Sequence, residues 1–167
     1  MKKTAFILLI IFAFYYKSFA AAAIIKSEID INLNMIKGSI TITSTKAETV
    51  TVSLYHDMQL LSSDKRVKYN KNRNEYTISL DGLSPVILSY IKNITDTSDT
   101  ISKDFISIYS SIVPAVTNIE NAELYINIPE NFQGLASQFL TFNKNENTML
   151  FTYNSLPENI YFAASSN

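Results

Sequence analysis

Three side chains in the first half of the sequence are of the types that a serine hydrolase uses. Ser53, His56 and Asp57 supply a hydroxyl, an imidazole and a carboxylate. In such an enzyme the imidazole lies between the other two groups, so that it can take the proton of the hydroxyl. Along a β-strand, however, adjacent residues and residues three positions apart face opposite sides. The spacing therefore separates the three groups, and we interpret His56 and Asp57 as a solvated pair at a strand end.

Carboxylates occur at two further places where metal binding or acid–base chemistry would need them. Asp96, Asp99 and Asp104 lie in or beside a segment rich in Thr and Ser. A calcium loop needs six or more oxygen ligands and a glycine at its sharp turn, and this segment contains no glycine. Glu28 and Asp30 share one strand face, which the alternation of side chains places in water. We interpret both groups as solvated carboxylates and predict neither a metal site nor a catalytic residue.

The composition excludes several other kinds of site. One histidine and no cysteine among 167 residues exclude thiol chemistry, disulfides and a His-rich metal cluster. Three glycines are too few for a glycine-rich phosphate loop. The 14 basic and 15 acidic residues, with a net charge of −1, provide no basic surface for nucleic acid. We therefore predict no cofactor, no nucleic-acid partner and no enzymatic activity.

The first twenty residues have the three parts of a secretory signal peptide. Lys2 and Lys3 precede an apolar run at 5–16, and Ser18 and Ala20 are small residues suited to positions −3 and −1 of a cleavage site. Twelve apolar residues rise only about 18 Å in a helix, whereas the hydrocarbon core of a membrane is about 30 Å thick. We predict cleavage between residues 20 and 23, no stable membrane span afterwards, and export to the periplasm, the cell surface or the extracellular medium.

The rest of the chain alternates between apolar and polar side chains, as β-strands with one buried face do. The clearest alternating segments are residues 39–43, 49–54, 76–80 and 122–128. Turn signals such as Asp81-Gly82 separate them, because both residues tolerate positive φ. The pattern predicts an all-β fold with a single antiparallel-rich domain over residues 24–162, either a sandwich or a short β-solenoid. We expect residues 163–167 to form a frayed tail.

Tyr125 is the candidate for a surface contact. It is out of phase with its apolar neighbours Leu124 and Ile126, so it should face away from the core. A tyrosine in such a position offers a ring and a hydroxyl to a ligand.

Two blocks of sequence are similar to a known bacterial pattern. Residues 35–43 contain Gly38 followed by an alternating strand, and after a short turn a second alternating strand spans 49–53. Further on, residues 122–131 form a strand that ends in Pro129 and Glu130. Together these blocks resemble exported bacterial adhesin domains built from β-strands. The resemblance implies an adhesive surface and stacked β-solenoid rungs, and it carries over no catalytic residue.

These observations favour an exported, non-enzymatic β-domain that acts through its surface, in adhesion, in envelope structure or by binding a partner. The expected partner is a protein or another component of the cell envelope. Two alternatives remain open. One is a small outer-membrane β-barrel, because the cleaved chain is long enough for eight strands of about ten residues. The other is a periplasmic β-domain that binds a small ligand between its sheets.

Overall fold

A computed structural model describes residues 21–64, 66–109, 111–135, 141–143, 147–153 and 162–166. These residues form β-strands and turns. The strands are β1 (Ala21–Asp30), β2 (Met35–Thr43), β3 (Ala47–Ser53), β4 (Met58–Ser63), β5 (Val67–Asn70), β6 (Glu75–Asp81), β7 (Val86–Asn93), β8 (Thr100–Ile101), β9 (Phe105–Ile108), β10 (Ala115–Val116), β11 (Ile119–Asn127), β12 (Phe132–Leu135), β13 (Thr141–Asn143), β14 (Thr148–Tyr153) and β15 (Phe162–Ser166). Within these ranges there is no helix with the length and apolar character needed to cross a membrane.

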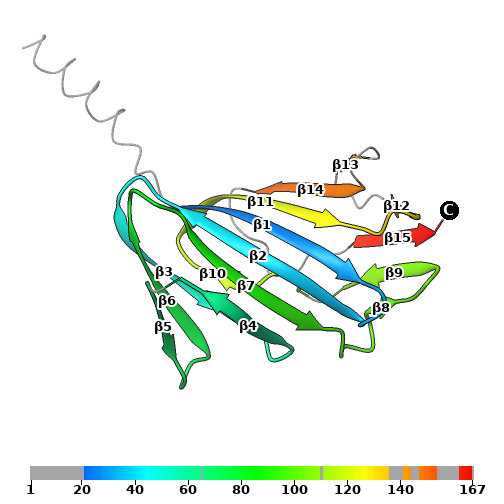
Figure 1. The fold of residues 1–167 in the computed structure, drawn as a ribbon, viewed down its shortest axis with the longest axis horizontal. Helices are drawn as coiled ribbons and strands as arrows, with labels where there is room; N and C mark the ends of the chain where they lie inside the picture. The colour runs from blue at the N-terminus through cyan, green and yellow to red at the C-terminus, as the bar shows by residue number, and fades with distance from the viewer. Residues whose placement is uncertain are drawn as a thin grey trace, which may run out of the picture.

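The strands form three sheets. The large sheet has the order β13-β14-β11-β1-β2-β7-β4, the second sheet β10-β3-β6-β5, and the third β12-β15-β9-β8. Figure 1 shows the long strands of the large sheet side by side, with β3, β5 and β6 toward one end of the molecule and β9, β12 and β15 toward the other. The all-β, antiparallel-rich fold predicted from the sequence is confirmed.

One pair of neighbouring strands runs parallel. β1 pairs with β11 in the same direction, from Ala21 opposite Ile119 to Glu28 opposite Asn127. Every other pairing among the described residues is antiparallel. Because the chain leaves both strands of a parallel pair at the same edge, the segments after β1 and β11 lie close together.

The alternation predicted from the sequence sorts side chains between a core and a surface. In β1 the odd-numbered residues 21–29 are buried, whereas Ile24, Lys26 and Glu28 are exposed. The same pattern holds in β2, β7 and β11, and buried side chains from all three sheets form one hydrophobic cluster. The three sheets thus share a single core, which fixes the register of every long strand.

In the core, the ring of Tyr90 fills the space that a side chain at position 38 would occupy, and residue 38 is a glycine. Gly38 lies opposite Tyr90 on β7 and opposite Ser27 on β1. A Cβ atom on Gly38 would lie 2.1 Å from Cζ of the Tyr90 ring. The fully buried Tyr90 hydroxyl donates a hydrogen bond to the carbonyl oxygen of Ile112 at 2.8 Å and lies 3.3 Å from Oγ of Ser27. Burial raises the pKa of Tyr90 far above its usual value.

The ends of the domain differ from the sequence prediction. Residues 21–23, which the prediction left outside the domain, belong to β1 and pair with β11. The expected frayed tail is instead β15, which lies between β12 and β9 and buries Ala163 and Ala164. The prediction failed because small side chains, which are common in disordered tails, also pack closely in a central strand. Residues 1–20, where we predict the signal peptide, lie outside the described residues.

Arg66 ties the turn before β5 to the turn between β6 and β7. Its guanidinium forms ion pairs with Asp64 and Asp81, each at 3.0 Å, and donates to the carbonyl oxygens of Ser84 and Pro85. The hydrogen bonds from Arg66 hold the pKa of Asp64 at about 2. Backbone N–H groups of Ser84 and Leu83 are the main cause of the pKa of about 2 at Asp81.

These lowered pKa values predict how acid affects stability. A carboxyl whose pKa is lower in the folded state stabilises the fold above its unfolded pKa, here 3.8, and this contribution is lost as the pH falls toward about 2. Arg66→Met should remove most of the stability that the lowered pKa of Asp64 provides, because Arg66 is the main cause of that shift. It should leave much of the contribution of Asp81, whose pKa is lowered mainly by backbone N–H groups. Urea unfolding should therefore show that the variant loses less stability than the parent between about pH 4 and pH 2. Arg73→Met, in the exposed β5–β6 turn, is the control, and an equal effect of both variants would contradict the assignment.

Candidate functional site

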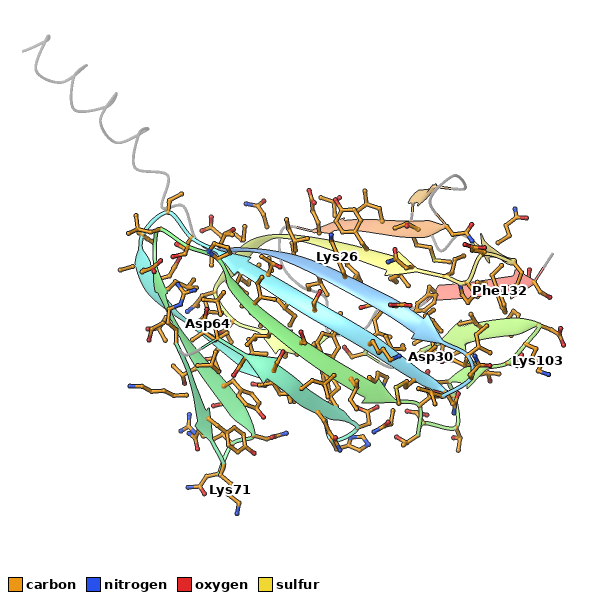
Figure 2. The ribbon with its side chains drawn as sticks, viewed as in Figure 1. Lys26, Asp30, Asp64, Lys71, Lys103 and Phe132 are labelled. Carbon is orange, nitrogen blue, oxygen red and sulfur yellow. The ribbon has the colours of Figure 1, made fainter. Side chains whose placement is uncertain are left out.

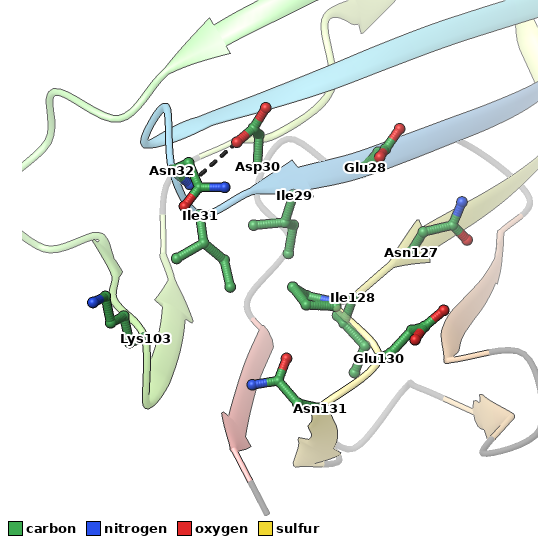
Figure 3. A pocket seen from close by; sticks show the side chains of 11 residues that line it. Glu28, Ile29, Asp30, Ile31, Asn32, Lys103, Asn127, Ile128, Glu130 and Asn131 are labelled. Carbon is green, nitrogen blue, oxygen red and sulfur yellow. Dashed lines mark hydrogen bonds between the residues drawn. The ribbon is translucent and has the colours of Figure 1, made fainter.

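A hollow of about 800 Å³ opens where the parallel strands β1 and β11 end. It is lined by residues 28–32, residues 127–131 and Lys103 from the β8–β9 turn, and we call it the β1–β11 hollow. Figure 3 shows Ile29, Ile31 and Ile128 facing a common space, with Lys103 on one side and Glu130 on the other. A volume of this size is within the range of about 300–1,000 Å³ that is usual for ligand sites.

Asp30 shapes the first wall of this hollow by ending β1. Its Oδ1 accepts the backbone N–H groups of Asn32 and Leu33, both at 3.1 Å, and so closes a turn after the strand. Asn34 completes the turn with a φ of 50°, which asparagine tolerates. The other oxygen of Asp30 accepts a hydrogen bond from Lys37 at 2.9 Å, and this bond is the main reason why the pKa of Asp30 is lowered.

Pro129 shapes the second wall by ending β11. Proline has no N–H to continue the ladder. Its carbonyl oxygen accepts hydrogen bonds from the backbone of Phe132 and from the side chain of Asn147, both at 2.9 Å. The strand end at Pro129 is where the sequence predicts it, and the bonds to Phe132 and Asn147 show what holds the following turn in place.

The hollow combines an apolar floor with a charged rim. Ile29 and Ile128 are buried and Ile31 is half-buried, so the floor is hydrocarbon. Asp30 forms an ion pair with Lys37, which also lies opposite Glu28 on β2. Glu130 makes no side-chain hydrogen bond to another described residue. Among the described residues that line the hollow, three carboxylates and one cation, Lys103, give the rim an excess of negative charge even with Lys37 beside it. Such a site can bind a cation that has a hydrocarbon stem.

Only part of this hollow can be identified from the sequence. Glu28 and Asp30 were expected as a solvated pair, and the structure places both on the rim. Ile31, Ile128 and Lys103 were not expected there, and they come from three separate segments. The signal that would have indicated them is the pairing of β1 with β11, and no local pattern reveals which strands pair in parallel.

Asp57 is not solvated as the sequence suggested. It is buried in the turn before β4 and forms an ion pair with Lys92 of β7, whose side chain is only 1% exposed. His56 beside it is exposed, and Ser53 is half-buried in β3, opposite Glu75. Because the Asp57 carboxylate binds the ammonium group of Lys92, it does not orient the imidazole as an acid in a hydrolase triad would.

The three aspartates of the Thr- and Ser-rich segment also separate. Asp96 and Asp104 are exposed, whereas Asp99 is buried and accepts the backbone N–H of Tyr109 at 2.7 Å. In the part of the chain that the structure describes, no three carboxylate or histidine side chains are grouped as a metal site would require. Asp99 therefore has a structural role that the sequence did not indicate.

Tyr125 lies on the outer side of β11, as its phase predicts. Its side chain is half-buried, and its hydroxyl donates a hydrogen bond to Glu123 at 2.8 Å. Asn127, which lines the β1–β11 hollow, is two residues further along the same face. The role of Tyr125 as a surface contact stays a prediction.

Comparison with known proteins identifies the fold. No protein-family model matches the sequence, and no curated protein matches it. Among solved structures, an aminopeptidase N family protein from Idiomarina loihiensis aligns with 87% of this chain, at 15% identity and a TM-score of 0.63. An M1 zinc metallopeptidase from Deinococcus radiodurans aligns with 87% at 9% identity, with a TM-score of 0.47. This chain covers 29% and 41% of those chains, respectively. What it shares with the Idiomarina protein is the fold of a β-structured part.

Proposed function

We propose that this chain is an exported, non-enzymatic β-domain that binds a partner protein through the β1–β11 hollow. The observation that carries the proposal is the apolar floor of Ile29, Ile31 and Ile128 beneath a rim on which carboxylates outnumber cations. The hollow is held open by two turns whose hydrogen bonds are satisfied within the domain. A preformed surface of this kind loses little entropy when a partner binds.

The chemistry of the hollow specifies the partner segment. A lysine or arginine side chain would lay its hydrocarbon stem on the isoleucine floor and place its cation beside Glu28 and Glu130. An apolar neighbour in the partner would cover the rest of the floor. We therefore expect a basic segment that contains at least one aliphatic or aromatic residue.

Two observations support a role without catalysis. The carboxylate of Asp57 is bound to Lys92, so the group nearest to His56 in the sequence is not available to orient it. Zinc peptidases of the His-Glu-x-x-His type need two histidines on one helical face. This chain has a single histidine, so the proposal carries over no peptidase activity from proteins of similar fold.

The pairing of residues 21–23 supports the earliest of the predicted cleavage positions, directly after Ala20. Ala21 is fully buried, and Ala22 and Ala23 pair with both β2 and β11. Cleavage at that bond leaves β1 whole, whereas cleavage two or three residues later removes paired backbone from the middle of the large sheet. We propose that the exported chain begins at Ala21.

Selection from a random peptide library tests the proposal, because the library samples many partner segments at once. A phage-displayed library of heptapeptides, panned on the purified exported chain, should yield peptides with Lys or Arg next to an apolar residue. Glu130→Lys should weaken their binding by at least about fivefold, because it replaces an attraction of about 1 kcal/mol by a repulsion. Glu120→Lys makes the same change in charge at an exposed position of β11 outside the hollow and should have little effect. Peptides without a basic residue, or equal losses in both variants, would refute the proposal.

A further inference from the structure

A second cavity, of about 340 Å³, lies above the buried ion pair of Asp57 and Lys92. It is lined by residues 55–57, Lys92, Asp96, Ser98, Tyr109 and Ser111, and we call it the Asp57 pocket. These residues come from the turn before β4, from β7, from the turn after β7 and from the segment after β9. The pocket shares no residue with the β1–β11 hollow.

The base of the Asp57 pocket has hydrogen-bonding capacity that the described residues do not use. Oδ2 of Asp57 accepts from Lys92, whereas Oδ1 is buried and has no hydrogen-bond donor among the described residues. An ammonium group has three donors, and the structure shows Lys92 directing one of them to Asp57. A buried ion pair is favourable only when its remaining lone pairs and protons also find partners. Two residues that line the pocket thus have an unused acceptor and unused donors next to each other.

The walls of the Asp57 pocket are polar or aromatic. None of the described residues that line it is an aliphatic hydrocarbon. Of the residues that line the pocket, His56 and Tyr109 are exposed, Tyr109 by 53%, whereas Tyr55 is half-buried. Tyrosine rings offer a flat face for stacking, and hydroxyls bond to polar groups around the edge of a ligand.

We propose that the Asp57 pocket binds a polyhydroxylated ligand, a single sugar ring. Two adjacent sugar hydroxyls match the base, because one donates to Oδ1 of Asp57 while its neighbour accepts from Nζ of Lys92. The ring face lies against Tyr109, and the remaining hydroxyls meet Asp96, Ser98 and Ser111. The volume is near the lower end of the range for small-ligand sites, which suits one ring.

Two other ligand classes fit the pocket less well. A hydrocarbon ligand would bury Oδ1 of Asp57 without a donor, which is costly. A peptide amide could satisfy the ion pair, but its flanking chain would leave the polar walls unmatched. A neutral sugar can hydrogen-bond both to the Asp57–Lys92 pair at the base and to the polar side chains of the walls.

Chemical-shift mapping of the exported, ¹⁵N-labelled chain tests this proposal. The probes are glucose, galactose, mannose and N-acetylglucosamine, with N-methylacetamide as the amide control. At least one sugar should shift the backbone amides of Asp57, Asp96, Ser98 and Ser111 in a saturable way. Tyr109→Ala should weaken this binding by about fivefold to tenfold. Tyr69→Ala should leave it unchanged, because Tyr69 is equally exposed at 53% but lies in β5, outside the pocket.

Three results would overturn the sugar assignment. The first is that no sugar shifts these amides, and the second is that N-methylacetamide shifts them as strongly as any sugar does. The third is that Tyr109→Ala and Tyr69→Ala weaken binding equally. Both tyrosines are exposed, but Tyr69 also stacks on Tyr76, so the amide spectrum of each free variant must first show that the fold is intact. Glu130→Lys should not change sugar binding, which separates this test from that of the proposed function.

Discussion

Replacing Asp57 with alanine is expected to lower the free energy of unfolding by about 3–5 kcal/mol. The change leaves the ammonium group of Lys92 buried without its ion-pair partner, and the side chain of Lys92 is only 1% exposed. Removing one member of a buried pair costs far more than the pair contributes, because the remaining charge is neither hydrated nor compensated. Urea unfolding monitored by tyrosine fluorescence measures the effect.

The double variant Asp57→Leu/Lys92→Met tests the cause of this loss. Replacing both charges by hydrocarbon of similar size is often neutral or stabilising, so the double variant should be more stable than Asp57→Ala. Asp64→Ala is the control at a more exposed ion pair and should cost much less than Asp57→Ala, because water screens and hydrates the charge that remains. A double variant as unstable as Asp57→Ala would contradict the view that the unpaired charge causes the loss.

The second large effect is expected from Gly38→Ala. In a strand, this change normally stabilises by reducing the entropy of the unfolded chain, by about 0.4–1 kcal/mol. Here the new methyl group overlaps the ring of Tyr90, which is fully buried and lies opposite Gly38 on the neighbouring strand β7. Overpacking of a core usually costs about 1–3 kcal/mol, and this overlap is severe. We expect a loss of about 3 kcal/mol, and a melting temperature lower by about 6–12 °C.

Two further variants show whether the Tyr90 ring is responsible. In a Tyr90→Leu background, Gly38→Ala should cost much less than in the parent, because the ring atoms it meets are gone. Ser39→Ala, one residue away on the other face of β2, should change stability by no more than about 0.5 kcal/mol. If Gly38→Ala cost the same with and without the Tyr90 ring, the close contact would not explain the glycine.

The strands could be predicted from the sequence because their signal is local. Alternation along 39–43 and 122–128 needs only neighbouring residues, and the structure confirms strands at both places. The turn at Asp81-Gly82 follows from the positive φ that glycine tolerates, and Gly82 has a φ of 76°. In these segments the local preference of the sequence agrees with the tertiary structure, so the sequence pattern alone predicts the strands.

The candidate sites could not be predicted in the same way, because their partners are distant in the sequence. Asp57 resembles a surface residue until Lys92 is known to lie against it, 35 residues later in the chain. Gly38 resembles an ordinary strand glycine until the Tyr90 ring is known to lie over it from the neighbouring strand. The apolar floor of the β1–β11 hollow depends on a parallel pairing between strands almost 100 residues apart. Side-chain type specifies what each group can do, but only the pairing of strands specifies what it meets.

The central claim is that the β1–β11 hollow binds a partner protein, and photo-crosslinking in the source cells tests it most directly. A photoreactive amino acid replaces the exposed Asn131 at the rim or, as the control, Lys71 at the tip of the β5–β6 hairpin. Figure 2 shows Lys71 at the opposite end of the molecule from Lys103 of the hollow. We predict a discrete covalent adduct from position 131 that Glu130→Lys abolishes, and none from position 71. Equal adducts from both positions, or no adduct from position 131, would contradict the claim.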